Sequence, residues 1–142
     1  MKERCPSAQF VCRAVLQDHR LAFTRLSKGR DCGVADVINE RGKVVWGVVY
    51  QISDYDIGAL DKNEGFQPNR KRDENAYVRE NYHVYEEGNI EKPLSVTIYI
   101  ANKQENPPPP NNDYKRLIVE GAKFWHLPED YIKKLEQIEV TT

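Results

Sequence analysis

The sequence predicts an α+β fold in which strands dominate the first part and helices the carboxyl-terminal part. Short β-prone runs recur between turn residues up to residue 52 and again over 76–101. After residue 113, apolar residues recur at helical spacing instead. With 142 residues the chain has the commonest size for one folding unit, so we expect a single domain over 1–142.

Four strands are expected in the first part. They are 8–16, 19–25, 34–38 and 43–52. The polar segment 39–42 ends in Gly42, where a β-hairpin needs positive φ, and therefore predicts a hairpin between the last two strands. The nearly unbroken apolar run 44–50 is typical of a strand that is buried on both faces.

A short helix is expected next. Ser53 is a suitable N-cap, and acidic residues in the first turn favour the positive end of the helix dipole. Gly65 is the expected C-terminal stop, which places Glu64 at the end of the helix. The polar residues 66–74 are expected to form a loop.

The strands predicted over 76–85 and 94–101 alternate in side-chain character. In the second of them the aliphatic residues face one side, and Tyr99 points away from that side. Pro128 fits the first position of the last helix. The proline run 107–110 resembles a polyproline II ligand, but no basic residue flanks it closely, so a stiff loop is the favoured interpretation.

Composition excludes several classes of function. The chain has 21 Lys and Arg against 22 Asp and Glu, a net charge of -1, so nothing favours binding of nucleic acid or an anionic membrane. No apolar run is long enough for a signal peptide or a membrane span. The three cysteines lack paired spacing and are expected to be ordinary core or surface residues, with no metal site. We therefore expect a cytoplasmic protein.

The segment 59–66, ALDKNEGF, contains the candidate catalytic residue, Glu64. GxSxG, HExxH, Walker A and GxGxxG motifs are all missing, so an enzyme with this sequence must perform chemistry that needs little from the protein. A carboxylate at a helix C-terminus costs about 0.3–1 kcal/mol, and this repulsion favours the protonated acid that general acid/base catalysis uses. From these residues alone, a catalytic carboxylate and an ordinary helix end are about equally supported.

Several segments, taken in order, resemble the gamma-glutamylcyclotransferase family. They are CPSA and HRLAF near the start, then GVADVI, VVWGVVYQI, ALDKNEGF and NDYKRLIVEGAKFWHLPEDYIKKL. The resemblance implies a small, mostly antiparallel β-barrel flanked by helices. It also implies a lyase that converts gamma-glutamyl amino acids to 5-oxoproline and a free amino acid. The substrate's own α-amino nitrogen would attack its gamma-carbonyl, Glu64 would act as general acid/base, and no metal or cofactor would be needed.

The resemblance also implies substrate-binding roles for Gly65, Tyr77, Tyr99 and Tyr114. For each tyrosine a core position is the alternative; the substrate role is preferred for Tyr114 and undecided for Tyr77. Family members begin with a strand and a Tyr-Gly-Ser-Asn loop that cradles the substrate, and Met1 falls after that place. We expect either an internal start within a longer protein or a short form with a damaged site. The barrel edge exposed in this way could pair with another chain, as in a homodimer.

Two functions are compatible with the sequence. The first is the cyclotransferase acting on gamma-glutamyl amino acids; gamma-glutamylamine and glutathione-specific activities are the alternatives, because a fold does not fix the substrate. The second is a non-catalytic small-molecule-binding or dimerisation module of the same fold. Turnover by the chain distinguishes the two.

Overall fold

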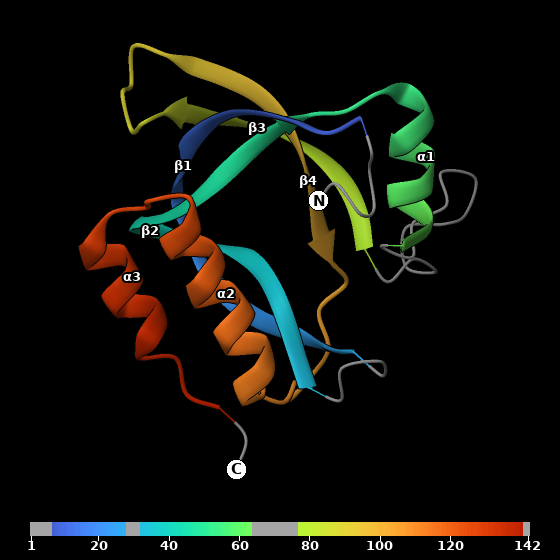
Figure 1. The fold of residues 1–142 in the computed structure, drawn as a ribbon. Coiled ribbons are helices and arrows are strands. Elements are labelled where there is room, and N and C mark those ends of the chain that lie inside the picture. The colour runs from blue at the N-terminus through green and yellow to red at the C-terminus, as the bar shows by residue number, and fades with distance from the viewer. Residues whose placement is uncertain (1–6, 28–31, 64–76, 141–142) are drawn as a thin grey trace. The chain divides into compact units, whose positions relative to one another are not determined.

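The computed structural model describes residues 7–27, 32–63 and 77–140, which form four strands and three helices (Figure 1). In chain order these are β1 (Gln9–Ser27), β2 (Cys32–Gln51), α1 (Asp54–Asn63), β3 (Tyr77–Glu86), β4 (Pro93–Ala101), α2 (Asn112–Phe124) and α3 (Glu129–Glu136). The expected α+β class, with helices toward the carboxyl end, is confirmed.

The four strands form one sheet in the order β2-β1-β3-β4. Among the described residues β2 and β4 are the outer strands, so this sheet is not closed into the small barrel that we expected. The run 44–50 in β2 is also not buried on both faces, since Val44 is 42% exposed and its neighbours in the run are half-buried. An outer strand has a neighbouring strand on one side only, which explains why it is less covered than a central strand.

β1 and β2 are long and unbroken, with 19 and 20 residues, where four shorter strands were expected. The hairpin predicted at 39–42 is wrong, because β2 runs through this segment. Gly42 does have positive φ, at 84°, and Asp18 in β1 has a φ of 57°. The N–H of Gly42 donates to Oδ1 of Asp18 at 3.1 Å. The glycine therefore marks an irregularity shared by two continuing strands and not a turn.

The described chain divides into two compact units, each with its own hydrophobic cluster. Unit 1 comprises residues 1–14 and 48–102, and unit 2 comprises 15–47 and 103–142. The cluster of unit 1 has Ala8 and Leu60 at its centre. The cluster of unit 2 has Ala122, Leu127 and Leu135 at its centre.

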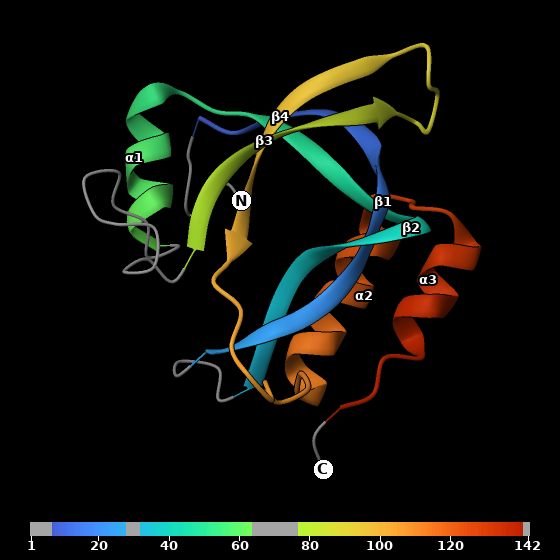
Figure 2. The ribbon, with the colours of Figure 1, turned by 180° about the vertical axis from the view of Figure 1, so that it is seen from behind.

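In unit 1, β3 and β4 form an antiparallel pair that runs as a twisted ribbon (Figure 2). Buried Val78 and Ile100 lie opposite each other on one face, and Arg79 and Tyr99 lie opposite each other on the other. The prediction that Tyr99 points away from the aliphatic face of its strand is confirmed.

Ser53 caps α1 as predicted. Its Oγ accepts the N–H of Asp56 at 3.2 Å, and its carbonyl oxygen accepts the N–H of Ile57 at 3.0 Å. Ser7 adds two bonds to Oδ2 of Asp56, from its hydroxyl at 2.5 Å and from its N–H at 2.8 Å. The hydroxyl bond, followed by the backbone bond, holds the pKa of Asp56 below its usual value. Ser7 thus ties the segment before β1 to the start of α1.

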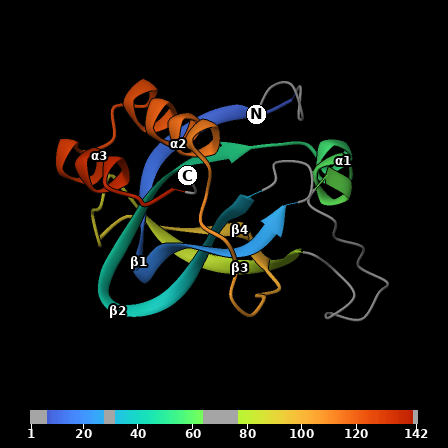
Figure 3. The same ribbon diagram turned by 90° about the horizontal axis from the view of Figure 1, so that it is seen from below.

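In unit 2, α2 and α3 lie side by side (Figure 3). Asn111 caps α2, since its side chain accepts the N–H of Tyr114 at 2.8 Å. Pro128 was predicted to be the first residue of the last helix. It is instead the N-cap of α3, one position before the first helical residue, Glu129. Tyr131 on α3 is half-buried, and this burial raises the pKa of its phenol. A backbone hydrogen bond from Trp46 lowers the pKa by a smaller amount.

The proline run 107–110 is a packed loop, as the sequence favoured. Pro110 is fully buried, and the carbonyl oxygen of Pro109 accepts the N–H of Gly33 at 3.0 Å. A Cβ at Gly33 would lie 1.8 Å from the carbonyl oxygen of Pro108, so this close approach requires glycine. The run therefore rests on the start of β2.

Candidate functional site

The two central residues of the predicted site, Glu64 and Gly65, lie outside the described residues, as does the loop expected over 66–74. The description of α1 ends at Asn63, so Glu64 is the next residue in the sequence. The remaining candidates, three tyrosines, are described.

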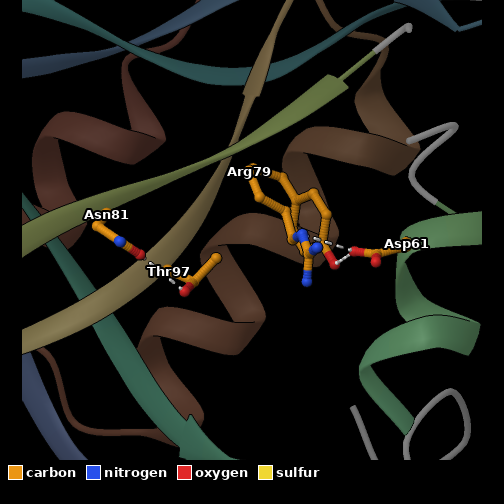
Figure 4. A network of polar contacts seen from close by, with 5 residues as sticks. Asp61, Arg79, Asn81 and Thr97 are labelled. Carbon is orange, nitrogen blue, oxygen red and sulfur yellow. Dashed lines mark hydrogen bonds and ion pairs between the residues drawn. The ribbon is translucent and has the colours of Figure 1, made fainter. Parts of the chain in front are cut away.

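A buried acid, Asp61, lies in the last turn of α1 and was not among the predicted site residues. The residue is 7% exposed. Its Oδ1 accepts the hydroxyl of Tyr99, and the Nε of Arg79 lies 3.3 Å from the same oxygen. Figure 4 shows Asp61 pointing from α1 toward Arg79 on β3. We call Asp61, Arg79 and Tyr99 the Asp61 cluster.

Three elements position the Asp61 cluster. Arg79 and Tyr99 are register partners in the β3–β4 ladder, so their side chains leave the same face of the sheet. Leu60, beside Asp61, is buried in the hydrophobic cluster of unit 1, and Tyr99 packs against that same cluster. The apolar contact thus holds the end of α1 where its carboxylate meets both partners.

Electrostatics also favour this arrangement. The side chain of Asp61 is 10% exposed, and an ionised carboxylate so shielded from water needs hydrogen-bond donors or a positive charge. Tyr99 supplies a hydroxyl donor and Arg79 supplies the charge. The side chain of Arg79 is 32% exposed, so the ion pair lies at the margin of the protein interior.

Tyr77 lies on the same face of the β3–β4 pair as the Asp61 cluster. It opens β3 opposite Ala101, two residues before Arg79. Farther along this face the hydroxyl of Thr97 donates to Oδ1 of Asn81 at 3.3 Å (Figure 4). The structure therefore brings Tyr77 and Tyr99, two of the predicted site residues, onto one polar face.

Tyr114 belongs to unit 2 and has a structural contact there. Its hydroxyl oxygen accepts the N–H of Ala35 at 3.0 Å, and its ring meets Phe23 edge to face at a centroid distance of 6.3 Å. The tyrosine therefore joins the first turn of α2 to β2, which is the core role weighed against substrate binding. Its part in substrate binding stays a prediction.

Other reactive groups in the described part of the chain do not form a second site. No cluster of three or more His, Cys, Asp or Glu side chains suited to a metal ion occurs among residues 7–27, 32–63 and 77–140. Cys12 is a buried free thiol, and burial, with smaller effects of Glu86 and Glu87, raises its pKa. None of the described helices combines the length and apolar character that crossing a membrane requires.

Comparison with known proteins identifies the family. The model of the AIG2-like family matches residues 44–135. Gamma-glutamylcyclotransferase from Mus musculus is 35% identical over 144 residues, which cover 96% of this chain and 70% of that protein. The protein of the same name from Homo sapiens is 34% identical, with the same coverage. The chain belongs to the gamma-glutamylcyclotransferase family.

A solved structure titled gamma-glutamyl cyclotransferase agrees with this assignment. It superposes with a TM-score of 0.85 at 32% identity and covers 99% of this chain and 80% of that one. The fold of the described residues is therefore that of the gamma-glutamylcyclotransferase family, although the sheet seen here is not closed.

The sequence of this gamma-glutamylcyclotransferase family member did contain a signal for Asp61. Ile57, Leu60 and Asp61 follow one another at the spacing i, i+3, i+4, which is the apolar stripe of an amphipathic helix. An acid on such a stripe is expected to be buried and partnered. The prediction considered only Glu64 in this helix and therefore did not include Asp61.

Proposed function

We propose that the protein is a gamma-glutamylcyclotransferase that converts gamma-glutamyl amino acids to 5-oxoproline and a free amino acid. The observation that carries the proposal is the family relationship, at 35% identity over 96% of the chain, which includes the segment with Glu64. The reaction also suits a chain without the sequence motifs of serine, metal or nucleotide-dependent enzymes, because the substrate brings its own nucleophile.

In the proposed reaction the α-amino nitrogen of the substrate attacks its gamma-carbonyl carbon and closes a five-membered ring. The bond between that carbon and the leaving amine then breaks. Glu64 accepts the proton lost by the attacking amine and returns a proton to the leaving amine, a role worth about 10²–10⁴ in rate. Holding the substrate folded supplies an effective molarity of about 10⁵ M or more.

The position of Glu64 in the sequence supports its role. It follows Asn63, where the description of α1 ends, and stands three positions after Asp61 in the sequence. Tyr77 and Tyr99, which share the polar face of the β3–β4 pair, are proposed to bind the substrate. Gly65 and Tyr114 complete the proposed set of substrate-binding residues, and the proposed mechanism requires no cofactor.

Release of 5-oxoproline from gamma-glutamyl-alanine tests the proposal. We expect turnover by the wild-type chain and a loss of about 100-fold or more in Glu64→Gln, since the amide cannot exchange protons. Glu91→Gln, an exposed acid between β3 and β4, is the matched control and should retain full activity. No 5-oxoproline from the wild type, or equal rates for the two variants, would refute the proposal.

Substrate choice is tested with the same assay. Gamma-glutamyl amino acids are expected to be better substrates than gamma-glutamylamines or glutathione. The order of kcat/KM over these three classes decides between the branches, and a higher value for either of the other two would reassign the substrate.

We further propose that chain 1–142 acts as one domain, in the cytoplasm, and as a homodimer. The outer position of β2 in the described sheet supports pairing, because the backbone groups of an outer strand can bond to a second chain. Sedimentation equilibrium checks this: a homodimer has twice the 16.5 kDa mass of the chain, and a monomer at all concentrations would contradict it.

A further inference from the structure

The Asp61 cluster limits the kind of hydrogen bond that Tyr99 can make to a ligand. A phenol has one hydrogen to donate, and its oxygen can also accept. In this structure Tyr99 donates that hydrogen to Oδ1 of Asp61. Any further bond from its oxygen to a ligand must therefore be one in which Tyr99 accepts.

We propose that Asp61 and Arg79 are positioning residues that orient the hydroxyl of Tyr99, so that Tyr99 binds the α-amino group of a gamma-glutamyl substrate and not its carboxylate. This inference rests on the proposed function and adds the substrate group that Tyr99 recognises. A carboxylate can only accept hydrogen bonds, so it cannot pair with an oxygen whose hydrogen is held by Asp61. An amino group carries the hydrogens that such an oxygen needs.

Arg79 makes the orientation firm. Its Nε lies 3.3 Å from the same Oδ1 that accepts the Tyr99 hydroxyl, and Figure 4 shows its side chain directed at Asp61. The carboxylate oxygen thus faces two donors, the hydroxyl of Tyr99 and the guanidinium of Arg79, and both bonds require it to accept. Tyr99 is thereby the donor in its bond with Asp61.

The competing possibility is that Arg79 binds the substrate carboxylate directly. Arginine is a common carboxylate ligand, and its side chain here is 32% exposed. The two possibilities differ in which substrate group is affected when each residue is changed. A set of ligands that lack one group at a time separates them.

The experiment measures dissociation constants by calorimetry with the full chain carrying Glu64→Gln, so that ligands are not consumed. Three ligands are compared: gamma-glutamyl-alanine, glutaryl-alanine, which lacks the α-amino group, and 4-aminobutyryl-alanine, which lacks the α-carboxylate. Tyr99→Phe should weaken the two amine-bearing ligands by about tenfold or more and leave glutaryl-alanine unchanged. Comparing either analogue with gamma-glutamyl-alanine shows whether the substitution weakens binding of the amino group or of the carboxylate.

Arg79 is tested in the same way. Arg79→Met should weaken the amine-bearing ligands, Arg79→Lys should restore part of the loss, and Arg79→Met should add nothing once Tyr99→Phe is present. Weaker glutaryl-alanine binding in Arg79→Met would overturn the positioning role and favour direct carboxylate binding.

The failures of the two proposals are distinguishable. If wild-type protein produces no 5-oxoproline, the proposed function fails and this inference fails with it. If turnover is normal but Tyr99→Phe weakens all three ligands equally, or none of them, only the role of Tyr99 is overturned. Thermal unfolding of each variant identifies any change that acts through the fold.

Discussion

Arg79 on β3 and Tyr99 on β4 are partners in the antiparallel ladder, and both reach the same oxygen, Oδ1 of Asp61. The carboxylate belongs to α1, so this single atom links the helix to both strands. The link has consequences for stability that can be measured apart from any activity.

Asp61→Ala should lower the free energy of unfolding by about 1–3 kcal/mol, because the part-buried hydrogen bond from the hydroxyl of Tyr99 to Asp61 is lost. Urea unfolding measures the change. Asp113→Ala is the matched control, since the side chain of Asp113 is 86% exposed and its place in the first turn of α2 contributes only about 0.3–1 kcal/mol. Equal unfolding midpoints for the two variants would contradict a structural role for the Asp61 cluster.

Ser7→Ala should destabilise the protein in a way that depends on pH. Ser7 lowers the pKa of Asp56 in the folded state, so its contribution is present above the unfolded pKa, about 4, and is lost as pH falls through the folded value. The difference in unfolding free energy between wild type and Ser7→Ala should therefore be largest near neutral pH and shrink in acid. Ser95→Ala, an exposed serine on β4, should show no such trend. A difference in unfolding free energy that stays constant with pH would contradict this explanation.

Lys103→Met should destabilise unit 2 by about 1–3 kcal/mol. The side chain of Asp36 is 0% exposed; it accepts the hydroxyl of Thr24 at 2.8 Å and lies 3.1 Å from Nζ of Lys103. Removing the ammonium leaves a buried carboxylate without that positive charge. Adding Asp36→Asn should recover part of the loss in a double-mutant cycle, because the amide is neutral. Strictly additive effects would show that the ion pair contributes nothing.

Leu135→Ala should cost about 2–4 kcal/mol, because it opens a cavity where α3 packs on α2. Leu135 is 5% exposed and belongs to the cluster of unit 2. Leu117→Ala, at a residue that is 51% exposed, is the control and should cost much less. Denaturant unfolding of both variants measures the difference, and a reversed order would contradict the packing described here.

Local signals in the sequence predicted much of the fold. Ser53 was identified as a cap, and the alternation in β4 placed Tyr99 correctly, because both depend on residues close in sequence. The hairpin at 39–42 was wrong because positive φ at Gly42 suits a turn and an irregular strand equally. Only the partner strand, where Asp18 meets Gly42, distinguishes the two cases.

The candidate site could be predicted less completely. Asp61 contacts Tyr99, which is 38 positions away in the sequence. No local sequence pattern can predict this contact. The same holds for Tyr114, whose hydroxyl meets a backbone N–H of β2 that is 79 positions away. The resemblance to the family pointed to the tyrosines as site residues. What each hydroxyl contacts, however, depends on long-range packing.

The division into two units has a practical consequence for engineering. The chain passes between the units at residues 14–15 and 47–48, inside β1 and β2, and again at 102–103, just after β4. Excising either unit would therefore sever two hydrogen-bonded strands, and neither fragment should be soluble by itself. The passage at 102–103 lies outside regular structure, but it adjoins the Lys103–Asp36 ion pair and the bond from the N–H of Gln104 to the carbonyl oxygen of Thr24 at 2.9 Å, so an insertion there is expected to destabilise unit 2.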